Sequence, residues 1–312
     1  MYLHENKEIF KASISQVNQT LEIESALIEK DYYITMLLQK LREKEPDIIF
    51  KGGTCLSKCY KIINRFSEDI DISLFNVNSQ PQSKKKKLSL YIKEILVDLG
   101  MTLNNAEQIK SGMSYNDYKA EYKTLFDTNS IDATIRIETM FLVNAFPTIT
   151  MPVTSLIYDY LNETGNQSVI EKYNLQPFEM TVQSLERTFV DKVFALGTHH
   201  LSNKKYRQSR HLYDLHQILP YVQVDKKLMQ LFDDVRQAWD DRKSSKDWQA
   251  AEDRDDLLDV LQYIIDNEVY RDDYENITSL LLYDDVSYEE AITSFSKIVS
   301  SMSKAMDGGS EM

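Results

Sequence analysis

The chain has 312 residues, of which 42% are hydrophobic, and a net charge of −13 at neutral pH. This length and apolar content support a real hydrophobic core in two domains or in one elaborated domain. The sequence has no run of about 18 apolar residues, and its N-terminus lacks the basic and then apolar pattern of a secretion signal. We therefore expect a cytoplasmic protein without a membrane span.

The negative charge is concentrated in the last third of the chain. Residues 225–312 have a net charge of −12, whereas residues 1–224 are nearly neutral, with a net charge of −1. Residues 84–87 are four consecutive lysines, which form either a solvated face or an edge that binds RNA phosphates. The overall acidity therefore does not exclude a nucleic acid substrate.

Helical and strand patterns alternate through the first half of the chain. Residues 5–45 predict two helices, and residues 47–50 predict a short buried strand that ends at a pair of glycines. Apolar residues at helical spacing follow the glycines. In residues 69–75 the polarity alternates, so that Ile70 and Ile72 share one face of a strand and Asp69 and Asp71 share the other.

The later elements are a basic helix, a pair of strands and then mainly helices. Residues 84–99 predict the basic helix, and residues 118–126 and 130–142 predict two strands joined by a turn near residues 127–130. After Pro152 the pattern becomes mainly helical, with a helix over residues 182–201 and another over residues 208–219. We therefore predict an α+β fold with a mixed α/β domain in residues 1–155 and a mainly helical domain in residues 156–312.

The two cysteines, Cys55 and Cys59, lie four residues apart on a predicted helix. No second pair of cysteines or histidines completes a metal site with them. We expect buried or half-buried free thiols, as in a reducing cytosol.

The sequence Gly52-Gly53-Thr54 stands between a predicted strand and a predicted helix. Glycine allows the backbone to approach a ligand closely, and a helix N-terminus offers free N–H groups that favour phosphate. Thr54 adds a hydroxyl group. The pattern of a Walker loop is absent, so this sequence alone fits either a phosphate-binding turn or an ordinary helix N-terminus.

Asp69 and Asp71 place two carboxylates on the same face of a strand, with Cα atoms about 6.5 to 7 Å apart. Such a pair can bind one or two Mg²⁺ ions, and two like charges this close are costly unless a cation neutralises them. Glu138 or Asp132, on a neighbouring predicted strand, is a candidate for a third metal ligand. The other interpretation of that strand is an exposed face on which Arg136 pairs with Glu138.

A glycine-rich turn, a helix and an Asp-x-Asp strand within 20 residues place a phosphate-binding turn beside a metal site. This is the layout of metal-dependent nucleotidyltransferases of the polymerase-beta type. Five segments together resemble the AbiEii/AbiGii nucleotidyltransferase toxins, which are relatives of the MenT toxins. They are residues 28–35 (IEKDYYIT), 50–60 (FKGGTCLSKCY), 65–72 (RFSEDIDI), 190–196 (VDKVFAL) and 209–215 (SRHLYDL).

The resemblance implies a polymerase-beta-like nucleotidyltransferase core followed by a helical C-terminal domain that contributes Lys192 and Asp214 to the cleft. It implies Mg²⁺-dependent transfer of a nucleoside monophosphate from an NTP to RNA, notably the 3′ end of tRNA, with release of pyrophosphate; Mn²⁺ is an alternative metal. It also implies a type IV toxin–antitoxin or abortive-infection system, with a separately encoded antitoxin that forms no stable complex. The biology would be phage defence or growth arrest.

The resemblance also assigns roles to individual residues: Gly53 and Thr54 would bind the triphosphate, and Asp69 and Asp71 would hold Mg²⁺. We add Gly52, Lys58 and Arg65 as candidate nucleotide-binding residues and Glu138 as the candidate third metal ligand. The catalytic residues are Asp69, Asp71, Lys192, which matches the essential helical lysine of the family, and Asp214.

The role of Asp214 is open in the sequence. It orients Lys192, acts as a base toward the acceptor hydroxyl, or pairs with Arg210 one helical turn earlier. His211 stands where many members of the family have aspartate. Glu29, Lys30 and Asp31 also match the family, as scaffold residues or residues at the rim of the cleft.

Two alternatives to RNA nucleotidyl transfer remain. One is transfer of a phosphoryl or nucleotidyl group to a hydroxyl of a protein or a small molecule. The other is a non-catalytic module that binds a partner. The presence of Asp69, Asp71 and Lys192 favours an enzyme over a binding module.

Overall fold

The computed structural model describes residues 1–65, 67, 69–77, 79–126, 131–240 and 254–307. The chain divides into two compact units. The first comprises Met1–Tyr60, Glu68–Asn144 and Thr148–Val182, and the second comprises Lys61–Ser67, Ala145–Pro147 and Gln183–Met312. Helices and strands are both abundant, which confirms the α+β fold class. The turn predicted at residues 127–130 lies outside the described residues.

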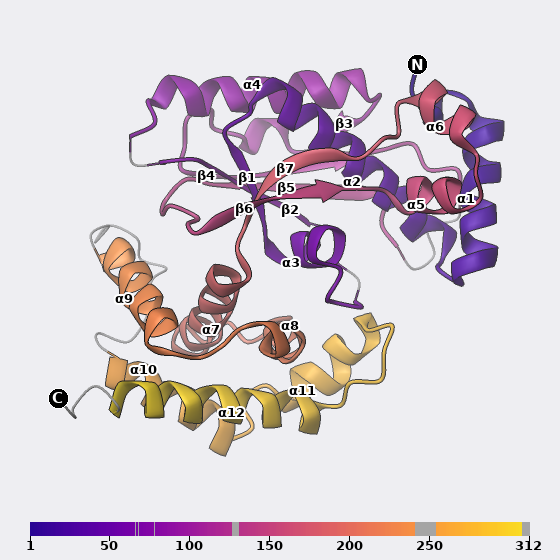
Figure 1. Cartoon of the computed structure of the whole chain (residues 1–312). Coiled ribbons are helices and arrows are strands. Elements are labelled where there is room, and N and C mark those ends of the chain that lie inside the picture. Colours follow the sequence, from indigo (N-terminus) through magenta and orange to yellow (C-terminus); the bar gives the residue numbers. More distant parts are fainter. Residues whose placement is uncertain (66, 68, 78, 127–130, 241–253, 308–312) are drawn as a thin grey trace. The chain divides into compact units, whose positions relative to one another are not determined.

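The first unit contains a mixed sheet of seven described strands in the order β3-β4-β5-β2-β1-β7-β6 (Figure 1). The strands are β1 (Ile48–Lys51), β2 (Asp69–Leu74), β3 (Thr102–Leu103), β4 (Tyr115–Glu121), β5 (Thr134–Met140), β6 (Thr148–Val153) and β7 (Phe178–Gln183). The strand β2 pairs antiparallel with β1 and parallel with β5, so it lies in the interior of the sheet.

The strand β7 was not predicted, and the prediction of a helix beginning at residue 182 is wrong. Met180 and Val182 alternate into the core of the first unit and are fully buried, as expected for a strand. The helix α7 begins only at Leu185, because the side chain of Ser184 accepts a hydrogen bond from the backbone N–H of Arg187 and caps the helix. The strands β3 and β6 were also not predicted.

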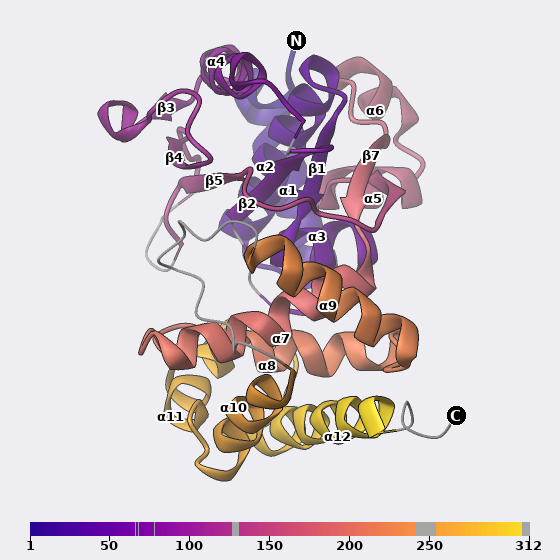
Figure 2. The same cartoon turned by 90° about the vertical axis from the view of Figure 1, so that its left-hand side faces the viewer.

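The helices of the first unit are α1 (Lys7–Leu21), α2 (Ser25–Lys44), α3 (Gly52–Cys55), α4 (Gln82–Asp98), α5 (Leu156–Glu163) and α6 (Gln167–Tyr173). The chain continues from α3 into a π-helical segment, Leu56–Tyr60. The predicted alternation of β2 is confirmed, since Ile70 and Ile72 are fully buried. They lie in one hydrophobic core with residues of α1, α2 and α4, and α2 and α4 are neighbours in both views (Figures 1 and 2). The other face of the central strands is left for polar side chains.

The helices of the second unit are α7 (Leu185–Leu201), α8 (Arg210–Ile218), α9 (Lys226–Asp240), α10 (Arg254–Asp266), α11 (Arg271–Asp273) and α12 (Tyr288–Asp307). The helix α8 contacts both α7 and α12 (Figure 2). Aromatic rings contribute to this core, since the ring of Phe232 lies 5.4 Å from that of Phe194 and 6.4 Å from that of Phe189.

Two expectations about the chain as a whole can be compared with the structure. Cys55 and Cys59 are both buried free thiols, as predicted. Among the described residues, no helix combines the length and the apolar character that crossing a membrane requires.

Candidate active site

The turn from β1 into α3 is built on Gly52. Its φ angle is +79°, in the left-handed region that residues with a side chain rarely adopt. A Cβ atom at this position would lie 1.9 Å from Oδ2 of Asp71 and 2.8 Å from its Cγ. Lys51 and Asp71 are opposite each other in the β1–β2 register, which explains the close approach. Only glycine allows this turn to lie directly against the Asp71 carboxylate.

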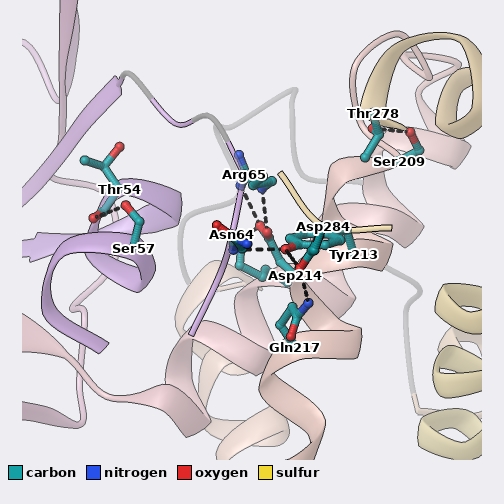
Figure 3. Close-up of polar contacts among 11 residues, drawn as sticks. Thr54, Ser57, Asn64, Arg65, Ser209, Tyr213, Asp214, Gln217, Thr278 and Asp284 are labelled. Carbon is teal, nitrogen blue, oxygen red and sulfur yellow. Dashed lines mark hydrogen bonds and ion pairs between the residues drawn. The ribbon is translucent and has the colours of Figure 1, made fainter. Parts of the chain in front are cut away.

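Thr54 follows on α3 and is 1% exposed. Its hydroxyl donates a hydrogen bond of 2.5 Å to the backbone carbonyl of Asp69, and its own carbonyl accepts a bond of 3.0 Å from the Ser57 hydroxyl (Figure 3). The Thr54 side chain therefore ties α3 to the first residue of β2. Any contribution of this turn to phosphate binding comes from backbone N–H groups, including that of Gly53, rather than from the threonine hydroxyl.

The polar face of the sheet brings acidic residues from three strands into register. Asp71 of β2 lies opposite Glu138 of β5, and Glu138 lies opposite Asp117 of β4. In the neighbouring row Asp69 lies opposite Arg136. Sequence reasoning missed Asp117, because it began the preceding strand at residue 118. The alternation of exposed and buried residues that starts at Tyr115 was the available signal.

Arg136 lies among these carboxylates. Its Nη2 atom is 3.0 Å from Oδ2 of Asp117 and 2.7 Å from Oε1 of Glu138, and its Nη1 atom is 3.9 Å from Oδ2 of Asp69. The hydrogen bond with Asp117 raises the pKa of Arg136 further above its ordinary value, so the guanidinium stays charged. The Arg136–Glu138 pair that the sequence left open as an alternative is thus formed.

Glu138 has an unusual environment for a carboxylate. Burial, together with the negative charge of Asp71, raises the pKa of Glu138 to about 7, although Arg136 opposes the shift. Asp132, the other candidate for a third ligand, precedes β5, and its carboxylate accepts a hydrogen bond of 3.1 Å from the Thr134 hydroxyl. Of the two candidates, the structure places Glu138 beside Asp71.

The donor set on this face is compatible with Mg²⁺. Asp69, Asp71 and Glu138 offer hard oxygen ligands on neighbouring strands. Within the part of the chain that the structure describes, no three His, Cys, Asp or Glu side chains are already arranged to hold a metal ion. In this arrangement Glu138 is paired with Arg136.

Lys58 is paired with a carboxylate of the same unit. Its ammonium group pairs with Oδ1 of Asp31, and Oδ2 of Asp31 accepts a hydrogen bond of 2.8 Å from the backbone N–H of Leu156. Glu29, on the same helix as Asp31, accepts bonds of 2.5 Å from the Thr124 hydroxyl and 3.0 Å from the N–H of Leu125. These contacts of Glu29 and Asp31 match a scaffold role.

A second polar cluster lies inside the second unit, around Asp214 of α8. Arg65 reaches the carboxylate with two bonds, 2.7 Å from Nε to Oδ1 and 2.8 Å from Nη2 to Oδ2 (Figure 3). Lys192 of α7 pairs with Oδ2. Asp214 is fully buried. Among the described residues, the carboxylate pairs with these two cations and not with Arg210. The cluster joins three segments of one unit around the Asp214 carboxylate.

Burial and charge act in opposite directions on the ionisable groups of this cluster. Burial alone would raise the pKa of Asp214, but the charges of Arg65 and Lys192 outweigh it and hold the pKa well below its ordinary range. Burial, reinforced by the charge of Arg65, lowers the pKa of Lys192, and the attraction of Asp214 opposes this. The Asp214 carboxylate thus holds both cations beside it in the folded protein.

Neighbouring residues hold this cluster in place. Tyr213 accepts a hydrogen bond of 2.9 Å from the N–H of Asn64, next to Arg65, and donates one of 2.9 Å to Asp284 (Figure 3).

His211 stacks on His199, with parallel rings 6.0 Å apart, and burial lowers the pKa of His211 well below its ordinary value. His211 is therefore neutral at pH 7.

The chain was compared with known families and structures. A family model described as the nucleotidyl transferase AbiEii toxin of type IV toxin–antitoxin systems matches residues 36–299. The chain belongs to this family. It is therefore a nucleotidyltransferase toxin, as the sequence motifs predicted. No curated protein matches the chain.

Solved structures support the AbiEii fold. MenT4, a nucleotidyltransferase toxin from Mycobacterium tuberculosis, is 16% identical with a TM-score of 0.54; the match covers 93% of this chain and 89% of MenT4. A nucleotidyltransferase structure from H. pylori, described as putative in its name, is also 16% identical, with a TM-score of 0.50 and coverage of 91% and 98%. At these identities the likeness concerns the fold.

Proposed function

We propose that this AbiEii toxin transfers a nucleoside monophosphate from an NTP to RNA, with the 3′ end of tRNA as acceptor and pyrophosphate as leaving group. The observation that carries the proposal is the contact of the Gly52 turn with Asp71, beside Asp69 on the same strand face. A glycine turn whose backbone N–H groups bind phosphate, beside a pair of carboxylates that bind a metal, would supply the two parts that activation of a triphosphate needs.

Asp69 and Asp71 would hold Mg²⁺, with Glu138 as the third ligand once it leaves Arg136; Mn²⁺ would fit the same oxygen ligands. When bound, the metal stabilises the negative charge that develops on the phosphates and on the attacking and leaving oxygens. The Gly52 turn keeps the Asp71 side chain in a fixed position, because the backbone leaves no room on that side. The hydrogen bond from the Thr54 hydroxyl to the Asp69 carbonyl fixes the backbone of the other aspartate.

Lys192 would bind the triphosphate as a point charge. An ammonium group has three donors, and the bond to Asp214 uses one of them. Arg65 is the other cation beside Asp214, and the proposal assigns it to nucleotide binding as well. Lys58 was also assigned to nucleotide binding, but its contact with Asp31 makes it a scaffold residue in this proposal.

Asp214 is assigned as a positioning residue rather than as a base. Both of its oxygens accept bonds from cations, and its pKa is held well below the ordinary range. A carboxylate with such a low pKa is a weak base, so it removes a proton from an acceptor hydroxyl poorly. Its role in the proposal is to hold Lys192 and Arg65 at fixed positions.

The proposal includes the cellular setting of the family. We place the reaction in the cytoplasm, where tRNA and NTPs are found. The partner would be a separately encoded antitoxin that counteracts the toxin without a stable complex. Purification of the toxin from cells that also express its antitoxin should then yield the toxin alone, and a complex that survives purification would contradict this part.

The decisive experiment incubates the purified protein with Mg²⁺, total RNA and ATP, GTP, CTP or UTP, each radiolabelled at the α-phosphate. We expect label in small RNA from one or more of the nucleotides, and none with Asp69→Ala. Lys119→Gln, which changes an exposed residue on β4, is the matched control and should keep its activity. Label in RNA that persists in Asp69→Ala would refute the assignment of the site.

The same assay separates the other functions. If no RNA is labelled, γ-labelled nucleotides with protein and small-molecule acceptors test phosphoryl transfer. Absence of transfer in every arm, with a correctly folded protein, would overturn the enzymatic proposal in favour of a partner-binding module.

A further inference from the structure

Arg136 is the central cation of the carboxylate face and is tied most firmly to Asp117. Its Nε atom is 3.3 Å from Oδ1 of Asp117 and its Nη2 atom 3.0 Å from Oδ2, a two-point contact that fixes the plane of the guanidinium. The strands β4 and β5, which carry these two residues, pair along the full length of β5. The position of the guanidinium is therefore set by the sheet and not by a mobile loop.

From this fixed position Arg136 also reaches both sides of the predicted metal site. Its Nη2 atom is 2.7 Å from Glu138 and its Nη1 atom is 3.9 Å from Asp69. Its side chain is 40% exposed, whereas those of Asp69, Glu138 and Asp117 are 20%, 21% and 22% exposed. The guanidinium thus neutralises part of the charge that a divalent cation would otherwise neutralise.

We propose that Arg136 is an internal counter-cation that competes with the divalent metal for Glu138 and Asp69. This inference rests on the proposed function, because it concerns the same metal site. With Arg136 in place, the nucleotide-free site has a low metal affinity, because the guanidinium already lies beside Glu138 and Asp69. The metal then binds together with the triphosphate, whose oxygens supply the missing ligands. Arg136 is a positioning residue, since it acts through the carboxylates.

The test is a titration of the nucleotide-free protein with Mn²⁺, followed by the electron paramagnetic resonance signal of the free ion. Removal of one positive charge next to the ligands in Arg136→Gln should tighten Mn²⁺ binding about tenfold. Arg136→Lys keeps the charge and should bind Mn²⁺ within about threefold of the wild type. Lys119→Gln is the matched control: Lys119 is opposite Arg136 in the register, and its loss should change the affinity by less than about twofold.

A second readout measures the same competition through the thermal stability of the protein. The thermal midpoint of Arg136→Gln should lie below that of the wild type without metal, and saturating Mn²⁺ should raise it by more than it raises the wild type. Asp69→Asn shows whether the ion occupies the predicted site, because it should abolish the shift in all backgrounds.

The possible outcomes separate the two proposals. Wild-type protein that binds Mn²⁺ at Asp69, with equal or weaker binding in Arg136→Gln, overturns the role of Arg136 and leaves the metal site standing. If neither the wild type nor Arg136→Gln binds Mn²⁺ in a way that depends on Asp69, both this inference and the proposed metal site fail.

Discussion

The substitution Gly52→Ala tests the link between the backbone turn and the carboxylate site. The new Cβ atom would lie 1.9 Å from Oδ2 of Asp71, and non-bonded contacts of a Cβ below 3.0 Å essentially do not occur. Rotation of the carboxylate does not remove the clash, because Cγ of Asp71 is 2.8 Å from the same point. Either Asp71 or the start of α3 must therefore move by about 1 Å.

A displacement of this size is large for a catalytic group. A misplacement of about 1 Å can reduce the rate about 100-fold, so we expect Gly52→Ala to lose at least that much nucleotidyl transfer. The free energy of unfolding should fall by about 2–4 kcal/mol, of which about 1 kcal/mol comes from the left-handed backbone and the rest from the clash.

Gly100 offers a matched control for the backbone contribution. Its φ angle is +65°, and an added Cβ would meet no atom within 4 Å. Gly100→Ala should therefore cost about 1 kcal/mol in a urea denaturation and leave the transfer rate unchanged. The double variant Gly52→Ala/Asp71→Ala should recover part of the stability but none of the activity. Equal stability and equal activity of Gly52→Ala and Gly100→Ala would refute the argument that Gly52 exists to accommodate Asp71.

Two further predictions concern the charged clusters. Asp214→Asn removes the carboxylate with which the buried Lys192 pairs, so the free energy of unfolding at pH 7 should fall by about 3–5 kcal/mol; a loss below about 1 kcal/mol in urea denaturation would contradict this. The pKa of Asp214 is lowered in the folded state, so its stabilisation is present above about pH 4 and the difference between variant and wild type should shrink in stronger acid. Glu138 behaves in the opposite way: its folded pKa is raised to about 7 from 4.5, so the folded state binds more protons and wild-type stability falls as the pH rises between these values. Metal-free Glu138→Gln should therefore be about 1–3 kcal/mol more stable than the wild type at pH 8 and equal to it below about pH 4.5, and denaturation curves that show a less stable variant at pH 8 would exclude the raised pKa.

Much of the carboxylate face could be predicted from the sequence, because local periodicity determines which side chains share a strand face. The alternation in residues 69–75 places Asp69 and Asp71 together and buries Ile70 and Ile72, whatever the neighbouring strands are. The glycine pair before the helix likewise carries its own signal, since only glycine readily adopts the backbone conformation of Gly52. These features depend on residues a few positions apart.

Only the tertiary structure determines which side chains from distant parts of the chain interact. Asp117 joins the carboxylate face through the pairing of β4 with β5, and Lys58 turns to Asp31, a residue of another helix. Periodicity within one segment contains no information about such partners, because strand order and register depend on the packing of the whole sheet.

In the second unit, too, the sequence determined local features and the tertiary structure determined which charged groups pair. The sequence placed Lys192 and Asp214 on helices, and the family motifs marked both as functional. Only the packing of α7 and α8 with the segment that contains Arg65 brings two cations to one buried carboxylate. The sequence by itself thus determined which chemical groups the protein has and which strand face or helix carries them. The tertiary structure decided which charges neutralise one another, because burial and pairing are set by contacts between segments far apart in the chain.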